Sequence, residues 1–380
     1  MPHLKGITWD HTRGYAPVRA ASESFKSINP EVHVEWDVRS LKDFGDSPIE
    51  PLVEKYDLLM IDHPFIGTAA EKKVFIALDE WLSEDYLKDQ EKNTVGKSFS
   101  SYSWNGHQWA LAADAAAQVA AYRKDLLEEF GFCVPRTWEE VLRLASNLPN
   151  GRKVALPLMP TDAVCCFLSI CANIGGTEFL TESSLKIDFE LGKDALSLLK
   201  KLVQVVHPNS LNMNPINTLN LMSSTDEVVY VPLLFGYSNY SRSSYAKNLI
   251  HFADIPSYGD EPRGGVLGGV GISVSQFSKY KKESISVASF IASGEFQKTI
   301  YFECGGQPAH RSAWIDPTVN LASNNFFEQT LRTLDLSYLR PRCRGYNMFQ
   351  EQAGNVIHNF LRHSSEIAET VQQINNLSNF

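Results

Sequence analysis

One stretch of the sequence decides the fold class: Tyr56-Asp57-Leu58-Leu59-Met60-Ile61-Asp62-His63-Pro64. Its apolar residues run without interruption instead of alternating with polar ones, a pattern typical of a strand that is buried in a parallel sheet. The run stops at Asp62, His63 and a proline, so a loop follows the strand directly. Buried parallel strands occur in folds that combine strands with helices, and the stretch therefore predicts an α/β protein.

The residues before this stretch continue the same pattern. Gly6–Trp9 is a short apolar strand, residues 10–15 form a polar loop, and Pro17–Ile28 has the spacing of an amphipathic helix. Val32–Val38 then alternates between apolar and polar side chains, as a second strand does. The order of strand, helix, strand and strand predicts one sheet with helical connections.

Polar side chains gather in the two loops that follow the first and third strands. In an open α/β sheet, ligands bind beyond the carboxyl ends of the strands, so both loops are expected to face one cleft. The candidate ligand-binding residues in these loops are Trp9, Asp10, His11, Arg13, Asp62 and His63. Two simpler interpretations stay open: Trp9 packs in the core while Arg13 pairs with Asp10, and His63 has a structural role.

Further along the chain, helices become more frequent. Trp104–Trp109 predicts a hairpin turn, which leads into the alanine-rich run 110–121. Thr137 and Glu140 have the spacing of a capping box and mark the start of a helix. Other expected helices are Phe75–Leu82, which is short, Lys124–Phe130, Asp188–Val206 and Asn355–Asn376, with the strand Val228–Leu234 and the glycine-rich segment Gly264–Ser273 between them. A second lobe is expected to begin near Asp114.

Length and composition narrow the class of protein. The chain has 380 residues, too many for one compact core and about right for two lobes. Hydrophobic residues make up 43%, and no run approaches the roughly 18 consecutive apolar residues of a membrane span. The formal net charge is −9, without a polybasic stretch that could follow a phosphate backbone. Nucleic acid is therefore not an expected partner.

Neither the cysteines nor the first residues point to a metal or to export. The six cysteines lack the paired spacing of a zinc site and are expected to be buried free thiols, and no pattern calls for a metal or cofactor. Residues 1–6 enter the first strand without a signal-peptide pattern, which favours a cytoplasmic chain. If a methionine has replaced a removed signal peptide, the periplasm or the cell surface is expected instead.

Four groups of residues, taken in order, resemble a known family. They are Gly106–Leu111 with Asp114, Tyr122–Leu126, Gly131, Pro135 and Thr137–Glu139; Gly268–Ser275 with Ala288–Ile291 and Gln297; Gly305–Arg311; and Leu339–Pro341. Each group is weak alone. Their order over nearly the whole length resembles the family 1 extracellular solute-binding proteins, the maltose-binding-protein-like carbohydrate-binding components of ABC importers.

The resemblance implies a fold and a way of working. It implies a periplasmic-binding-protein-like fold with two α/β lobes, a three-segment hinge and a ligand cleft between the lobes. The first lobe would combine residues 1–112 with 256–308, and the second residues 113–255 with 309–380. Such a protein is expected to be a monomer that captures a small polar ligand by hinge closure and is recognised by the membrane permease subunits of an importer.

The resemblance also adds candidates for the binding site. A polyol needs carboxylates or amides for its hydroxyls and aromatic rings for its C–H faces. Asp114 falls where many sugar-binding relatives carry an aspartate, with a hinge hydrogen bond or an N-cap as the alternative. Arg13, if it faces the ligand, would favour an anionic sugar derivative. The other candidates are Tyr237, Asn239, Tyr240, Gly268, Gly269, Gln307 and Arg311.

Simpler roles stay open for several of these residues as well. The two tyrosines could be core residues, the two glycines tight-turn residues, and Arg311 a salt-bridge residue. An enzyme is the competing class, with Asp10, Asp62 and Asp114 as carboxylates for glycoside hydrolysis. No nucleophile elbow, P-loop or HExxH pattern supports catalysis, so the sequence favours a binding protein, with a cytoplasmic ligand sensor as a further alternative.

Overall fold

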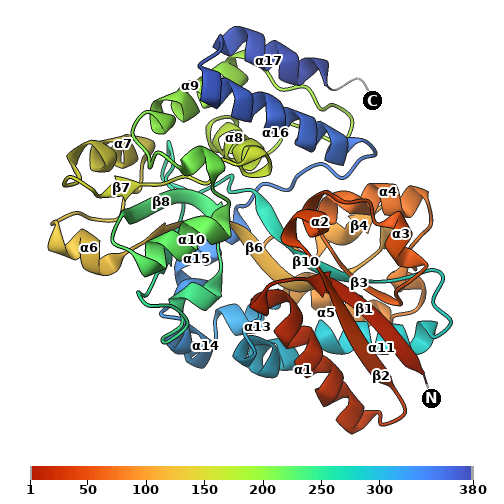
Figure 1. Cartoon of the computed structure of the whole chain (residues 1–380). Coiled ribbons are helices and arrows are strands. Elements are labelled where there is room, and N and C mark those ends of the chain that lie inside the picture. Colours follow the sequence, from red (N-terminus) through yellow and green to blue (C-terminus); the bar gives the residue numbers. More distant parts are fainter. Residues whose placement is uncertain (1, 378–380) are drawn as a thin grey trace. The chain divides into compact units, whose positions relative to one another are not determined.

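The computed structural model describes residues 2–377 (Figure 1). The chain divides into two compact units. The first unit comprises Met1–Ala115, Gly268–Val319 and Arg342–Arg344, and the second comprises Ala116–Leu267, Asn320–Pro341 and Gly345–Phe380. These changes of unit follow residues 115, 267 and 319, each later in the chain than the 112, 255 and 308 expected from sequence. The short return of residues 342–344 to the first unit was not expected.

The first unit is built on a mixed sheet. Its strands are β1 (His3–Trp9), β2 (His33–Arg39), β3 (Leu58–Ile61) and β10 (Leu267–Val274), in the order β2-β1-β3-β10. β1 is parallel to β2 and to β3, while β10 is antiparallel to β3. All four residues of β3 are fully buried, which confirms the deciding stretch as a central strand. The carboxyl ends of β1 and β3 therefore lie at one edge of the sheet.

Helix α1 (Thr12–Ile28) begins earlier than the sequence indicated. The spacing predicted a loop over residues 10–15 and a helix from Pro17. In the structure the ring of His11 accepts a hydrogen bond from the Arg13 amide, so this side chain caps the helix and Pro17 lies inside it. Arg13 consequently lies in the first turn of a helix instead of in a loop.

The other helices and strands of the first unit are short. The helices are α2 (Leu41–Asp46), α3 (Glu50–Val53), α4 (Ile66–Glu71), α5 (Glu84–Asn93), α11 (Lys281–Ile291), α12 (Gly294–Phe296) and α13 (Arg311–Trp314), and α14 (Pro317–Ala322) runs into the second unit. The expected hairpin is confirmed as β4 (Ser103–Trp104) and β5 (His107–Gln108). The segment expected as a short helix, Phe75–Leu82, contains only a 3-10 turn at Leu78–Glu80.

The second unit contains the carboxyl-terminal half of β6 (Leu111–Tyr122), which is antiparallel to β8 (Val228–Phe235) and to β9 (His251–Ala253), while β7 (Lys153–Val154) is parallel to β8. Its helices are α6 (Lys124–Glu129), α7 (Trp138–Asn147), α8 (Pro160–Gly175), α9 (Phe189–Val203), α10 (Pro215–Ser224), α15 (Phe326–Asp335), α16 (Tyr346–His363) and α17 (Ile367–Asn376). The capping box of Thr137 and Glu140 is confirmed at the start of α7.

One expected helix is two helices in the structure. Asn355–Asn376 has a continuous amphipathic pattern, but α16 ends at His363 and α17 begins at Ile367. Ser364 between them has a left-handed backbone, with a φ of 54°, which an uninterrupted helix does not allow. Sequence periodicity shows which faces are apolar but does not reveal a break that keeps the same face buried.

Candidate functional site

The buried ion pair of Arg13 and Asp114 is the centre of the candidate site in the first unit. The Arg13 Nε donates to Asp114 Oδ2 at 2.8 Å, and its Nη2 donates to Oδ1 at 2.5 Å. Both side chains are at least 95% buried. The alternative considered from sequence, in which Arg13 pairs with Asp10, is wrong because the guanidinium takes both oxygens of Asp114 instead. Two-pronged geometry of this kind fixes orientation as well as charge.

The backbone next to Asp114 is fixed by Gln307. The backbone amide of Ala115 donates to the Gln307 carbonyl at 3.1 Å, and the Gln307 side-chain amide donates to the Ala115 carbonyl at 2.8 Å. Burial raises the pKa of the Asp114 carboxyl, whereas the Arg13 guanidinium and the backbone amide of Gln307 act to lower it. Gln307 was a predicted site residue, and the structure brings it together with Asp114 inside the first unit.

Gln297 holds together the backbone segments on either side of the Arg13–Asp114 pair. It was not predicted as a site residue. Its side-chain oxygen accepts from the backbone amides of Ala309 and His310, each at 2.7 Å. Its side-chain nitrogen donates to the carbonyls of Ala112 and Ile291, at 3.1 and 3.2 Å. Gln297 is fully buried, so all four hydrogen-bonding positions of its amide are used. It ties the segment before Asp114 to the segment after Gln307.

The residues of the first predicted loop take different positions. Trp9 is 3% exposed and packs in the hydrophobic core, where its ring lies 5.3 Å from that of Phe44. Asp10 is exposed, and its backbone amide donates to the Arg39 carbonyl. Burial, followed by the nearby Arg13 charge, lowers the pKa of His11 from 6.5 to about 4. A neutral His11 ring is consistent with its role as the acceptor that caps α1.

Asp62 and His63 lie together at the end of β3. The Asp62 carboxylate accepts from the His63 backbone amide at 2.8 Å, and its Oδ1 lies 3.1 Å from the His63 Nδ1. The His63 side chain is fully buried, and its ring lies 6.5 Å from that of Tyr102 in an edge-on arrangement. Asp62 caps the short 3-10 helix His63–Phe65, so a structural role accounts for these contacts.

The two predicted glycines and Arg311 lie on other segments of the first unit. Gly268 and Gly269 are partly exposed in β10, and Gly269 has a φ of 104°, which favours glycine. Arg311 begins the short helix α13, next to the segment that Gln297 holds.

The three candidates of the second unit are buried after β8. Tyr237, Asn239 and Tyr240 are 7, 2 and 3% exposed, and the last two lie in the 3-10 helix Ser238–Ser241. The Tyr240 hydroxyl donates to Asn220 Oδ1 at 2.6 Å, and its ring meets that of Tyr245 edge to face. Tyr240 therefore uses its polar group within the second unit.

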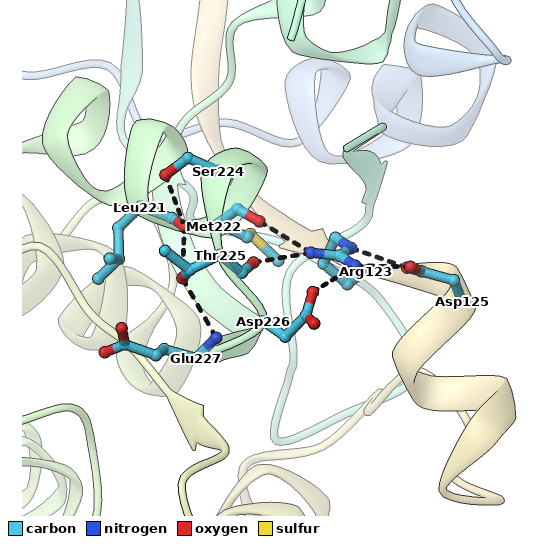
Figure 2. A network of polar contacts seen from close by, with 8 residues as sticks. All are labelled: Arg123, Asp125, Leu221, Met222, Ser224, Thr225, Asp226 and Glu227. Carbon is cyan, nitrogen blue, oxygen red and sulfur yellow. Dashed lines mark hydrogen bonds and ion pairs between the residues drawn. The ribbon is translucent and has the colours of Figure 1, made fainter. Parts of the chain in front are cut away.

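A further polar network of the second unit surrounds Arg123, a residue of the Tyr122–Leu126 group that resembles the family. Its guanidinium donates to both carboxylate oxygens of Asp125, to Asp226 and to the carbonyls of Met222 and Thr225 (Figure 2). The Arg123 side chain is 3% exposed. The network joins the end of β6 to the end of α10 and the residues just before β8, so it stabilises the ends of these two neighbouring strands.

Metal ligands, membrane-spanning helices and the cysteines are the remaining features of the structure. Within residues 2–377, no group of three or more His, Cys, Asp or Glu side chains is placed to hold a metal ion. The same residues include no helix that is long and apolar enough to span a membrane. Cys165, Cys166 and Cys171 are buried free thiols as expected, but Cys133 is exposed and the other two cysteines are partly exposed.

These features define a class of protein. Two α/β units that are linked by repeated chain crossings have the architecture of two-lobed binding proteins. The chain belongs to the family of bacterial extracellular solute-binding proteins, because the model of that family matches residues 9–298.

Solved structures share the whole fold at low sequence identity. Maltose-bound MalE3 of T. maritima is 20% identical, with a TM-score of 0.85 over 99% of this chain and 98% of that one. A ribitol complex of an ABC transporter solute-binding protein from Agrobacterium radiobacter K84 is 18% identical, with a TM-score of 0.83 and the same coverage. A protein of the same description from Thermotoga lettingae TMO, bound to α-D-tagatose, is 18% identical, with a TM-score of 0.82 over 100% of both chains.

Proposed function

We propose that this protein is the solute-binding component of an ABC importer and that it captures a neutral sugar or polyol by hinge closure. It acts as a monomer in the periplasm or at the cell surface, delivers its ligand to membrane permease subunits and catalyses no reaction. Family membership supports the transport role. The three similar structures are complexes with maltose, ribitol and tagatose, which supports the ligand class.

The observation that carries this proposal is the place of the Arg13–Asp114 pair. Asp114 lies one residue before the first change of unit, on the strand β6 that passes from one unit to the other. A carboxylate has about four lone-pair positions, and Arg13 occupies two of them. The Gln307 backbone amide also acts on this carboxylate, and the position that is left is suited to accept a hydrogen bond from a ligand hydroxyl. Asp114 is therefore the residue that we expect to bind the ligand most directly.

The same pair supports a neutral ligand over an anionic one. The sequence left an anionic sugar derivative open as a ligand, provided that Arg13 faces it. Its Nε and Nη2 edge is taken by Asp114, and a two-pronged edge of this kind can recognise carboxylates and phosphates. Because the charges of the two side chains offset each other, the pair favours a neutral ligand.

The remaining predicted residues keep supporting roles in this proposal. The candidate ligand-binding residues that this proposal keeps are Asp10, His11, Asp62, Gly268, Gly269, Gln307 and Arg311 of the first unit and Tyr237 and Asn239 of the second. Ligand binding stabilises the closed state only by the contacts that are added there.

An enzymatic role has weaker support. A general acid or base must exchange a proton at the pH of reaction, whereas Asp114 is held by an arginine that stays charged. Asp62 is engaged with the His63 backbone and ring, and Asp10 is exposed.

The test is a ligand panel monitored by thermal shift and calorimetry. Maltose, ribitol, tagatose and mannitol represent neutral ligands, and gluconate, galacturonate and a sulfonated glucose represent anionic ones. A neutral ligand is expected to raise the melting temperature in a saturable way, because it binds only the folded state. Stronger binding of the anionic compounds would contradict the inference from Arg13, and turnover of a glycoside without saturable binding would favour the enzyme.

A further inference from the structure

Tyr301 lies beside the Arg13–Asp114 pair but takes no part in the contacts described so far. It ends the π-helix Gln297–Tyr301, and α1 packs against this helix in the first unit. The ring packs closely against Gly306, where an added Cβ would come within 2.3 Å of two ring carbons. Gly306 immediately precedes Gln307, whose backbone amide acts on the Asp114 carboxyl, so the ring of Tyr301 packs next to the segment that holds Asp114.

The hydroxyl of Tyr301 is buried without a hydrogen-bond partner. The side chain is fully buried, and the oxygen has no partner among residues 2–377. Burial raises the pKa of Tyr301, the Asp114 carboxylate raises it further and the Arg13 guanidinium lowers it, so both charges are within electrostatic reach. The hydroxyl therefore stays protonated and remains available as a donor.

An unsatisfied buried hydroxyl is unfavourable by itself. It costs about 1–3 kcal/mol relative to a satisfied one, and a phenylalanine of nearly the same shape avoids this cost. The ring of Tyr301 already packs with Phe296 and with the core of the first unit, so packing gives no reason for the hydroxyl. Its position beside Asp114 suggests that its partner is bound at the same place.

We propose that Tyr301 determines ligand specificity, by donating its hydroxyl proton to the same ligand hydroxyl that donates to Asp114. This inference rests on the proposed function, and it adds a binding residue that the sequence did not indicate. A ligand hydroxyl is both donor and acceptor, so it satisfies a carboxylate and a phenol together. A ligand without a hydroxyl at that position leaves both buried groups unsatisfied, which is how such sites discriminate strongly.

The experiment compares Tyr301→Phe with a matched control. Tyr230 of the second unit is also fully buried with an unpartnered hydroxyl, and it lies in β8. Calorimetry with maltose, ribitol, tagatose and mannitol gives Kd for the wild type and both variants, and urea unfolding without ligand gives their stabilities. Tyr301→Phe is expected to raise Kd by about 5- to 150-fold, the equivalent of one lost buried hydrogen bond. Its ligand-free stability stays unchanged or rises, and Tyr230→Phe leaves Kd unchanged.

A second comparison tests whether the two groups share one ligand hydroxyl. If they do, the effects of Tyr301→Phe and Asp114→Asn on Kd are not additive in the double variant. An unchanged Kd for Tyr301→Phe in a protein that binds one of the four ligands overturns the proposal and leaves the proposed function intact. Loss of ligand-free stability with unchanged Kd also overturns it, because the hydroxyl then has a structural partner. A wild type that binds no compound of the panel contradicts the proposed function itself.

Discussion

Arg13 and Asp114 are 101 residues apart in the sequence, and they form a buried two-pronged ion pair in the first unit. Arg13 comes from the first turn of α1 and Asp114 from β6. Removing two charges from water costs several kcal/mol per ion, and good geometry is needed to offset that cost. The pair therefore joins the first helix of the chain to the strand that leaves the unit.

Replacing Arg13 by methionine is expected to destabilise the protein by about 3–5 kcal/mol near neutral pH, because the Asp114 carboxylate is left buried and unpaired. Without the guanidinium, burial raises the folded-state pKa of Asp114 above the unfolded value, while the Gln307 backbone amide still acts to lower it. A raised carboxyl pKa makes the folded state bind more protons, so the loss of stability grows as pH rises above about 4. Urea unfolding at pH 5 and pH 8 measures this difference.

The control for this prediction is the double variant Arg13→Met with Asp114→Leu. Replacement of a buried ion pair by apolar residues is often neutral or stabilising, so the double variant should regain most of the lost stability and show no such pH dependence. An equal loss of stability in the single and double variants would show that shape, and not charge, sets the cost.

His11 should make the folded state sensitive to acid. Its pKa is lowered from 6.5 to about 4 by burial and by Arg13, so the unfolded chain binds the proton more readily. Stability is then fully present above pH 6.5 and falls as pH decreases towards 4, by at most about 3 kcal/mol. His11→Asn keeps a capping acceptor without the titration. Unfolding at pH 7 and pH 4.5 should show a smaller acid loss in this variant, and equal losses would contradict the prediction.

Gln297→Met is expected to weaken the first unit by about 2–4 kcal/mol, because the four backbone groups that the amide satisfies lose a buried partner. Hydrogen exchange at Ala309 and His310 should become faster, since their amides donate to Gln297. Gln276 is an exposed glutamine of the same unit, and Gln276→Met is the matched control. Unchanged exchange at the two amides would argue against a supporting role for Gln297.

Arg123→Lys should destabilise the second unit by about 2–4 kcal/mol although the charge is kept. An ammonium group cannot reproduce the flat fork that reaches two carboxylates and two carbonyls (Figure 2). The two carboxylate side chains are 61% and 50% exposed, so Asp125→Asn and Asp226→Asn should each cost less than about 1 kcal/mol. Denaturant unfolding of the three variants tests whether Arg123→Lys loses the most stability. A larger loss of stability in either asparagine variant would contradict the prediction.

The sequence was most informative where a signal is local. The apolar run that became β3, the hairpin before β6 and the capping box of α7 each depend on neighbouring residues, and all three are confirmed. Local signals failed at helix ends: α1 begins at Thr12 because of an unusual histidine cap, and the last expected helix breaks at Ser364. Both cases depend on a single backbone conformation, which periodicity averages out.

The sequence by itself determined the α/β class and the family. Those properties follow from periodicity and motif order, which the chain carries along its length. Only the tertiary structure decided the partner of Arg13. Asp10 is three residues away and looked like the natural partner, whereas Asp114 is far along the chain and comes close to Arg13 only through folding. The sequence also did not indicate the roles assigned to Gln297 and Tyr301, since the hydrogen-bond partners of a buried amide or phenol are set by the groups that folding places around it.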